Sequence, residues 1–173
     1  METIPLANFS LAEVLPPSLL AHQAIAAERN ITLIAPIALI DTVVMANRLA
    51  LREVVNNLLD NGIKYTPNGG LLEVSLALEK VSSSGMDWVT LAIADTGYGI
   101  PGGDQGKIFE RNYRGTQAKG PINGTGLGLA IVADLVAQMG GKITVISPNG
   151  LSSDPDHPGS TFILWLRSGE GSG

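Results

Sequence analysis

Residues 51–67, LREVVNNLLDNGIKYTP, say most about the fold of this 173-residue chain. At about 100° of rotation per residue, a helix through this stretch separates apolar from polar side chains. The apolar side holds Leu51, Val54, Val55, Leu58 and Leu59. The polar side holds Glu53, Asn57, Asn61 and Lys64. With Asn47 as its N-cap, the pattern predicts a helix that runs to about Tyr65 and packs its apolar side on a sheet.

The polar side of this helix carries two asparagines, Asn57 and Asn61, spaced by four residues. Asparagine is a poor helix former that prefers caps and turns, so its presence here suggests a function. Carboxamide and carboxylate oxygens, as in Asn57 and Glu53, suit Mg²⁺ that is also bound by substrate phosphates. The row therefore indicates a Mg²⁺–phosphate site, and a plain solvated helix face is the alternative.

The rest of the chain alternates helices and strands. We expect further helices at residues 18–29, after a break at Pro16 and Pro17, and at 127–139. Strands are expected at residues 31–34, 71–81, 88–94, 142–146 and 161–166. The sequence SSSG at 82–85 makes two of them a hairpin. This order predicts an α/β (α+β) fold, a two-layer sandwich in which about three helices cover one face of a mixed β-sheet.

Composition limits the possible functions. The net charge of −5 argues against a nucleic-acid duplex as partner. Cysteine is absent, which excludes disulfides, thiolate zinc sites and cysteine nucleophiles. No apolar run reaches the roughly 18 residues of a membrane span, and the N-terminus lacks the pattern of a signal peptide. We expect a cytoplasmic domain at residues 1–167 with a flexible tail at 168–173, and a larger, membrane-anchored parent protein is compatible with this.

A second candidate site is LAIADTGYGI, residues 91–100, where an apolar strand leads to Asp95 and a glycine-rich turn. A carboxylate there can accept a hydrogen bond from an exocyclic amine such as that of adenine. An Asx-turn that only closes the loop is the alternative. Residues 97–102 match G-x-G-x-x-G, but Pro101 and Gly103 disfavour the helix that a dinucleotide fold requires. A Walker A sequence is absent as well, so a nucleotide would be bound without a P-loop.

Glycines also lead into a helix at GTGLGLAIV, residues 124–132. Free N–H groups and the positive end of the helix dipole make helix N-termini good phosphate sites, although a tight turn beside the sheet is the alternative. The preceding loop, residues 101–123, is net +2, from Lys107, Arg111, Arg114 and Lys119 against Asp104 and Glu110. Such a long basic loop suits a lid over a polyphosphate, and ordinary surface charge is the alternative.

These four features, in this order, resemble the ATP-binding catalytic domain of sensor histidine kinases, within the GHKL ATPase superfamily. NNLLDNGIKYTP is similar to the N box, ADTGYGI to the G1 box, KIFERNYR to the F box and GTGLGLAIV to the G2 box. GSTFILWL, near the C-terminus, is similar to the last family motif. The similarity covers about residues 8–167 and implies the Bergerat fold, a two-layer sandwich with a long ATP lid.

The resemblance implies ATP and Mg²⁺ as cofactors and gives roles to individual residues. Asn57 would coordinate Mg²⁺, Glu53 would be the polarising carboxylate or general base, and Arg114 would reach the γ-phosphate. Asp95 would accept from the adenine amine, and Tyr65 would flank the ring. The implied cofactor-binding residues are Asn57, Asn61, Lys64, Tyr65, Asp95, Gly97, Gly99, Ile100, Phe109, Gly124, Thr125, Gly126, Leu127, Gly128, Leu129 and Thr161.

Some positions depart from the family pattern. Gly62 stands where alanine is common, and Asn112 stands where a second aromatic residue is common in the F box. The larger difference is the reactive histidine, because neither His22 nor His157 lies in an H box. We expect His22 on a helix surface or half buried, and His157 without a chemical role.

The main hypothesis is the catalytic domain of a two-component sensor kinase. It would present the γ-phosphate of Mg-ATP to a histidine on a separate dimerisation domain, for signal transduction to a response regulator. Alone, the chain would bind ATP or ADP without completing its own reaction. Two alternatives stay open: a regulatory module that binds nucleotide without phosphotransfer, and an ATP-hydrolysing relative. Neither a nucleic-acid partner nor a membrane span is expected for this chain.

Overall fold

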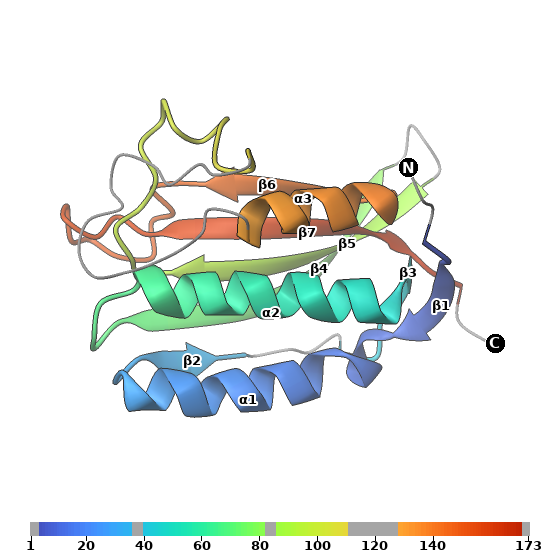
Figure 1. Ribbon diagram of the computed structural model, residues 1–173, viewed down its shortest axis with the longest axis horizontal. Coiled ribbons are helices and arrows are strands. Elements are labelled where there is room, and N and C mark those ends of the chain that lie inside the picture. The colour runs from blue at the N-terminus through green and yellow to red at the C-terminus, as the bar shows by residue number, and fades with distance from the viewer. Residues whose placement is uncertain (1–3, 36–39, 82–85, 111–127, 171–173) are drawn as a thin grey trace.

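The chain folds into two layers. The computed structural model describes residues 4–35, 40–81, 86–110 and 128–170. Within these ranges a β-sheet forms one layer and three α-helices lie together on one of its faces (Figure 1). The helices are α1 (Leu15–Glu28), α2 (Arg48–Tyr65) and α3 (Gly128–Gln138), and a short 3-10 helix, η1 (Leu11–Glu13), precedes α1. This arrangement confirms the two-layer fold expected from the sequence.

The sheet is mixed, as expected. Its strands are β1 (Ala7–Ser10), β2 (Thr32–Ile34), β3 (Val43–Ala46), β4 (Leu71–Val81), β5 (Met86–Asp95), β6 (Lys142–Ile146) and β7 (Ser160–Ser168). The order is β1-β3-β7-β5-β4-β2, and β6 also pairs with β7. The β2–β4 pair is parallel and β4–β5 is the expected antiparallel hairpin, whose turn at 82–85 lies outside the described residues. The register places Asp95 of β5 between Leu72 of β4 and Ser160 of β7.

Two short strands, β1 and β3, are missing from the sequence-based prediction. Each has only four residues, which is too short for a clear alternation of apolar and polar side chains. Their partners are distant in sequence, since β1 pairs with β3 and β3 pairs with the far end of β7. That end of β7 continues through Ser168, and Gly169 N donates to Val43 O at 2.9 Å. A boundary between domain and tail at residue 167 stays a prediction.

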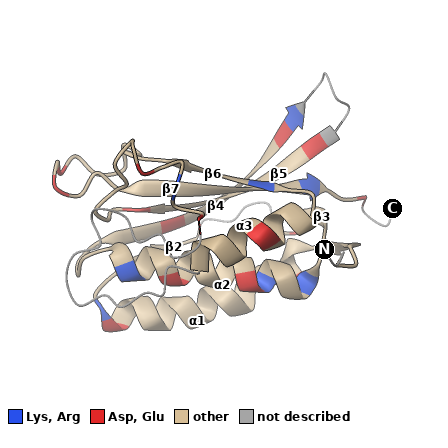
Figure 2. Ribbon diagram, turned by 45° about the horizontal axis from the view of Figure 1, so that its top comes forward, with Lys and Arg blue, Asp and Glu red and all other residues tan. Residues whose placement is uncertain are grey.

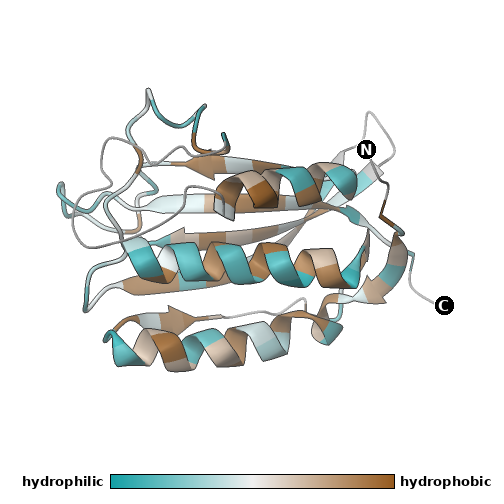
Figure 3. Ribbon diagram, in the orientation of Figure 1, coloured by the Kyte–Doolittle hydropathy of each residue, from teal (hydrophilic) through white to brown (hydrophobic). Residues whose placement is uncertain are grey.

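The core lies between the sheet and the helices, and α2 contributes a large part of it. The five apolar residues that the pattern placed on one side of α2 are all buried: Leu51, Val54, Val55, Leu58 and Leu59. Hydrophilic and hydrophobic bands alternate along α2 in Figure 3, because only one side of the helix packs on the sheet. Asn47 caps the helix as predicted, and its Oδ1 accepts from Ala50 N at 3.0 Å. Gly62 allows close packing, since a Cβ there would lie 2.6 Å from Leu72 Cδ1.

Helix α1 differs from the prediction in two respects. It begins at Leu15 and includes Pro16 and Pro17 in its first turn, rather than beginning after them. Proline fits there because first-turn N–H groups have no partner within the helix. His22 is 5% exposed, so it is buried rather than half buried or on the surface. Its Nδ1 lies 2.7 Å from the carbonyl oxygen of the residue one turn earlier, and its Nε2 lies 2.8 Å from Asp60 Oδ1 of α2.

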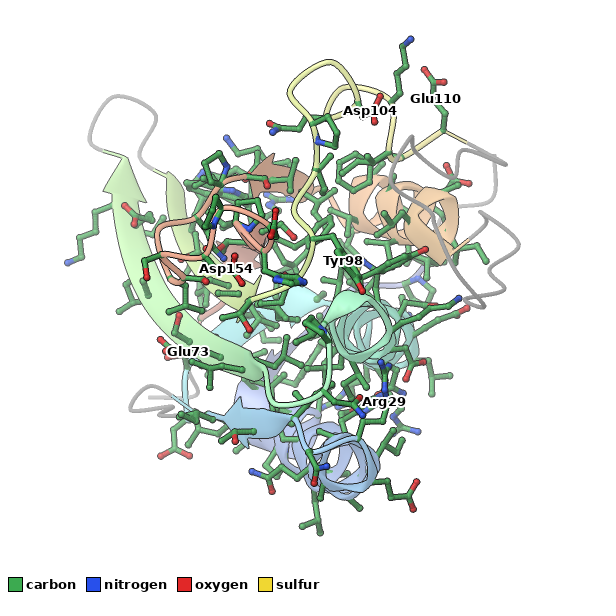
Figure 4. The ribbon with its side chains drawn as sticks, turned by 90° about the vertical axis from the view of Figure 1, so that its left-hand side faces the viewer. Arg29, Glu73, Tyr98, Asp104, Glu110 and Asp154 are labelled. Carbon is green, nitrogen blue, oxygen red and sulfur yellow. The ribbon has the colours of Figure 1, made fainter. Side chains whose placement is uncertain are left out.

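Arg29, directly after α1, binds the end of α2. Its Nη1 donates to Ile63 O at 2.6 Å and its Nη2 donates to Thr66 O at 3.3 Å. Carbonyl groups at the end of a helix lack donors within the helix, so the guanidinium group satisfies two of them. Figure 4 shows Arg29 between the two helices. The contact holds the end of α2 that carries Lys64 and Tyr65.

Helix α3 packs beside α2 and confirms the helix expected at residues 127–139. Its apolar residues Ala130, Val132 and Val136 are buried. In the part of the chain that the structure describes, no helix has both the length and the apolar character that crossing a membrane requires.

Candidate functional site

Several elements that carry predicted site residues meet at one end of the molecule, on the left in Figure 1. There α2 ends, α3 begins, and β5 ends at Asp95. The loop that follows β5 and the loop between β6 and β7 lie at the same end (Figure 1). The fold therefore brings together the asparagine helix, the Asp95 turn and the helix that the glycines introduce.

Asp95 is a buried carboxylate, 4% exposed, at the end of β5. Its Oδ1 accepts hydrogen bonds from Gly97 N at 2.9 Å and Ser160 N at 3.2 Å, and its Oδ2 accepts from Ser160 Oγ at 3.1 Å. Burial raises the pKa of this carboxyl, and the three hydrogen bonds act in the opposite direction. The bond from Gly97 N is the Asx-turn that the sequence left open as an alternative. Oδ2 accepts one bond here and has the capacity for another.

The two glycines of the turn occur where a side chain would collide with its neighbours. A Cβ at Gly97 would lie 2.5 Å from Tyr65 O and 2.9 Å from Asp95 Oδ1. Gly99 has a φ of +75°, a conformation that favours glycine, and its Cβ would lie 2.6 Å from Pro158 Cγ. Gly97 therefore allows the turn to approach the end of α2, where Tyr65 lies.

The polar side of α2 points away from the sheet and toward α3. Glu53 is exposed, and Asn57, Asn61 and Lys64 are half buried. Asn57 Nδ2 donates to Glu53 O at 2.9 Å, which leaves Oδ1 as the outward atom of the carboxamide. A Cβ at Gly128 would lie 3.6 Å from that oxygen. Asn57, on the polar row of α2, thus lies beside Gly128 at the start of α3.

The first part of the basic loop is folded against the core. Ile100 and Phe109 pack against buried residues, and the Phe109 ring meets Phe162 edge-on with centroids 6.3 Å apart. Residues 101–110 form three successive turns, closed by backbone hydrogen bonds of 2.8 to 2.9 Å. The remaining expected site residues, Arg114, Gly124, Thr125, Gly126 and Leu127, lie outside the described residues.

The structure does not bring Thr161 together with Asp95. Side chains alternate along a strand, and Ser160 faces Asp95, so Thr161 lies on the opposite face of the sheet. Ser160 is a site residue that the sequence analysis missed. The signal was present, because residues 162, 164 and 166 are apolar and buried, and that alternation places residue 160 on the same face. Leu129, in the first turn of α3, is half buried against the core.

The loop between β6 and β7, residues 147–159, is bonded to the Asp95 turn. Gly159 N donates to Gly97 O at 3.0 Å, and Asn149 Nδ2 donates to Asp95 O at 2.9 Å. Sequence reasoning could not find these contacts, because their acceptors are backbone carbonyls that any sequence would offer.

Farther out, the same loop places an aromatic contact beside the turn. The rings of Tyr98 and His157 have centroids 5.2 Å apart, and His157 Nδ1 lies 2.8 Å from Asp154 Oδ2. The hydrogen bond with His157 lowers the pKa of the exposed Asp154 carboxyl. Figure 4 shows Tyr98 and Asp154 at this end of the molecule. The expectation that His157 has no chemical role stays a prediction.

Charge and metal-binding groups constrain what this end can bind. Basic and acidic residues are interspersed along α2 in Figure 2 and form no single patch there. Over the described ranges, no group of three or more histidine or carboxylate side chains is placed to hold a metal ion. A Mg²⁺ ion at Asn57 would therefore take its other ligands from phosphate oxygens and water, a donor set that Mg²⁺ commonly has. The outward carboxamide oxygen of Asn57 fits that use.

Comparisons with known proteins bear on the family and the fold of this chain. The family model described as "Histidine kinase-, DNA gyrase B-, and HSP90-like ATPase" matches residues 46–170. "Sensor histidine kinase Hik2" of Synechocystis sp. is 89% identical over 170 residues, which cover 98% of this chain and 39% of that protein. The Hik2 of Thermosynechococcus vestitus is 42% identical over 149 residues, covering 85% of this chain and 37% of that protein. The chain thus spans about two-fifths of the length of these curated relatives.

A solved structure has the same fold. The mycobacterial sensor histidine kinase MprB superposes with a TM-score of 0.77 at 27% identity, covering 94% of this chain and 98% of that chain. The catalytic domain of histidine kinase ThkA, at 23% identity and a TM-score of 0.74, shares the fold. Both matches confirm the fold that the sequence resemblance implied.

Proposed function

This chain belongs to the family of histidine kinase-, DNA gyrase B- and HSP90-like ATPases, and we propose that it is the ATP-binding catalytic domain of a two-component sensor kinase. It would hold Mg-ATP in the cytoplasm and present the γ-phosphate to a histidine on a separate dimerisation domain of the parent kinase. A response regulator would then receive the phosphoryl group. The kinase branch of the family is favoured because the relatives at 89% and 42% identity are both named sensor histidine kinases.

One observation carries the proposal: α2 and β5 end, and α3 begins, at the same end of the fold (Figure 1). The Asn57 carboxamide oxygen faces Gly128, 3.6 Å from the Cβ position there. A helix start binds phosphate, and a carboxamide oxygen binds Mg²⁺. A carboxylate at a strand end accepts from an exocyclic amine. A molecule with an amine-bearing ring at one end and phosphates at the other matches both sites, and ATP is such a molecule.

The purine side of the site is built around Asp95. Oδ2 of its carboxylate accepts a hydrogen bond from the adenine amine. The hydrogen bonds from Gly97 N and Ser160 Oγ fix the orientation of the carboxylate. Ser160 is the residue of β7 that lies beside this carboxylate, whereas Thr161, expected among the cofactor-binding residues, lies on the opposite face of the sheet. The half-buried Tyr65 flanks the ring, and Gly97 allows the base to approach the turn closely.

The phosphate side lies between α2 and α3. Asn57 coordinates Mg²⁺, which neutralises phosphate charge when bound, and Asn61 and Lys64 contact phosphate or ribose. The first N–H groups of α3, at Gly128 and Leu129, bind phosphate oxygens. From the sequence resemblance, the glycines at 124 and 126 extend this cradle and Arg114 reaches the γ-phosphate.

The work of the chain in phosphoryl transfer is positioning and charge stabilisation. The phosphoryl group leaves the β-phosphate oxygen of ATP, so ADP remains, and it bonds to a ring nitrogen of the acceptor histidine. Glu53 is exposed one turn before Asn57, where it can face an incoming imidazole and orient it or take its proton. We take the acceptor from outside this chain, because His22 is buried and bonded to Asp60 and His157 is bonded to Asp154.

The test supplies that acceptor. The chain is mixed with γ-labelled ATP, Mg²⁺ and a separately produced histidine-bearing dimerisation domain of the parent kinase. We expect label on the histidine of the added domain, loss of that label without Mg²⁺, and no stable label on the chain alone. A variant of the added domain with its histidine changed to glutamine is the control.

The two alternative functions give different results in the same assay. Nucleotide binding without any label transfer would identify a regulatory module. Steady release of phosphate by the chain alone would identify an ATP-hydrolysing relative. Absence of ATP binding in calorimetry would overturn all three.

A further inference from the structure

We propose that Ser147, in the loop between β6 and β7, is a positioning residue that determines how strongly this site prefers an adenine to a purine without the 6-amine. The inference rests on the proposed nucleotide site and adds a specificity-determining residue to it. It is carried by the hydrogen bonds that connect this loop to Asp95.

The Ser147 hydroxyl joins the end of the Asp95 turn to the end of the loop. Its Oγ accepts from Ile100 N at 2.9 Å and donates to Gly159 O at 2.7 Å. The Ser147 carbonyl accepts from Gln105 Nε2 at 2.9 Å, and Gln105 also donates to Ile100 O at 3.0 Å. One half-buried residue thus contacts the Asp95 turn, the start of the basic loop and the residue before β7.

Gly159 connects Ser147 to the carboxylate of Asp95. Its N–H donates to Gly97 O at 3.0 Å, and the next residue, Ser160, donates to the carboxylate of Asp95 through its backbone and side chain. Gly159 also packs so closely on the Asp95 carbonyl that a Cβ would collide with it. Asn149 Nδ2 donates a hydrogen bond to that carbonyl at 2.9 Å. The position of the Asp95 carboxylate therefore depends on how the base of the loop is held.

Removal of the Ser147 hydroxyl would leave Ile100 N–H and Gly159 C=O without their partner, so the turn could shift relative to Ser160. Such a shift affects the purine more than the phosphates, because the phosphates bind between α2 and α3. Inosine triphosphate has a carbonyl group where ATP has the 6-amine. A site built to hydrogen-bond the 6-amine disfavours an analogue with an acceptor oxygen in that position, so the ratio of the two affinities reports the position of Asp95.

The experiment measures the dissociation constants of Mg-ATP and Mg-inosine triphosphate by calorimetry for the full chain and four variants. For Ser147→Ala we expect about tenfold weaker ATP binding and a change of less than about twofold for inosine triphosphate. Asn149→Asp should also reduce the preference for ATP over inosine triphosphate. This variant keeps the oxygen that accepts from Leu151 N but loses the N–H group that donates to Asp95 O. Ser147→Thr, which keeps the hydroxyl, should restore the ratio.

Ser152→Ala is the matched control, because Ser152 Oγ accepts from Asp154 N within the loop at 3.1 Å and does not contact the turn. It should leave both affinities unchanged. An equal loss of ATP and inosine triphosphate binding in Ser147→Ala would show a merely structural role and overturn the inference. If Ser147→Ala does not fold, a wild-type affinity ratio in Asn149→Asp overturns it. A wild-type chain that binds neither nucleotide overturns the proposed function itself, a result distinct from these.

Discussion

Substitution of Asp95 by asparagine should stabilise the nucleotide-free chain and weaken nucleotide binding. The carboxyl is buried, and burial raises its pKa, so the fold holds the charged form less well than water does. An amide keeps the shape of the side chain. Its oxygen can accept from Gly97 N and Ser160 N, and its NH₂ can donate to Ser160 Oγ, which then acts as acceptor. The variant therefore loses the buried charge without losing a hydrogen bond.

The size of the binding effect follows from the lost acceptor. A hydrogen bond to a charged group contributes about 1.5 to 3 kcal/mol, which corresponds to roughly a tenfold to hundredfold loss of ATP affinity. The stability effect depends on pH. Because the folded-state pKa of Asp95 is raised, the native state binds the proton more tightly than the unfolded chain does. The free energy of unfolding of the wild type therefore falls as pH rises from about 4 through the raised pKa. The asparagine variant lacks this pH dependence, because an amide does not titrate.

Calorimetry with Mg-ATP and thermal unfolding between about pH 4 and pH 7 test both effects. We expect the variant to unfold at a higher temperature than wild type near pH 7, and the difference to shrink as the pH is lowered. Asp156→Asn makes the same chemical change at an exposed position and should alter neither quantity. An unchanged ATP affinity would remove Asp95 from the purine site, and a variant that is less stable near neutral pH would refute the reasoning about its charge.

Three further outcomes are expected. Gly97→Ala should destabilise the chain and abolish ATP binding, because its Cβ would lie 2.5 Å from a backbone oxygen at the end of α2; Gly102→Ala, with no atom within 4 Å of the added Cβ, should do neither. Asn57→Ala should remove the Mg²⁺ dependence of ATP binding while the melting temperature without nucleotide stays near wild type, and loss of folding would contradict this. His22→Gln and Asp60→Asn, measured singly and together by urea unfolding, should show a coupling energy of about 1 kcal/mol, and additive effects would exclude a stabilising contact between them.

The sequence was sufficient for elements that carry a whole periodic pattern and for sites on such elements. Helix α2 agrees with its prediction at both ends, because 18 residues repeat the apolar pattern and Asn47 supplies a cap. Asp95 was found because an apolar strand leads directly to it. Strands β1 and β3 were not found, because four residues contain no period and their pairing depends on residues far along the chain.

The missed site residues have a common cause. Ser147 and Asn149 form hydrogen bonds with backbone atoms of the Asp95 turn. Every residue has such backbone atoms, so the sequence does not indicate which of them will be the partner. Ser160 is different, because the alternation of β7 would have shown that it, and not Thr161, faces the carboxylate. His22 was misjudged because its burial depends on how α1 packs on α2, a long-range arrangement that also brings its Nε2 to Asp60.

The contacts of Arg29 limit how far this domain can be shortened from its N-terminal side. The family model begins at residue 46, well after α1, yet the guanidinium group of Arg29 holds the two carbonyls at the end of α2. A chain cut at the family boundary would lose this anchor, and β4 would lose its neighbour β2. The helix end with Lys64 and Tyr65 would then fray into solvent. The smallest unit that retains the proposed ATP site is therefore larger than the region in which the family can be recognised.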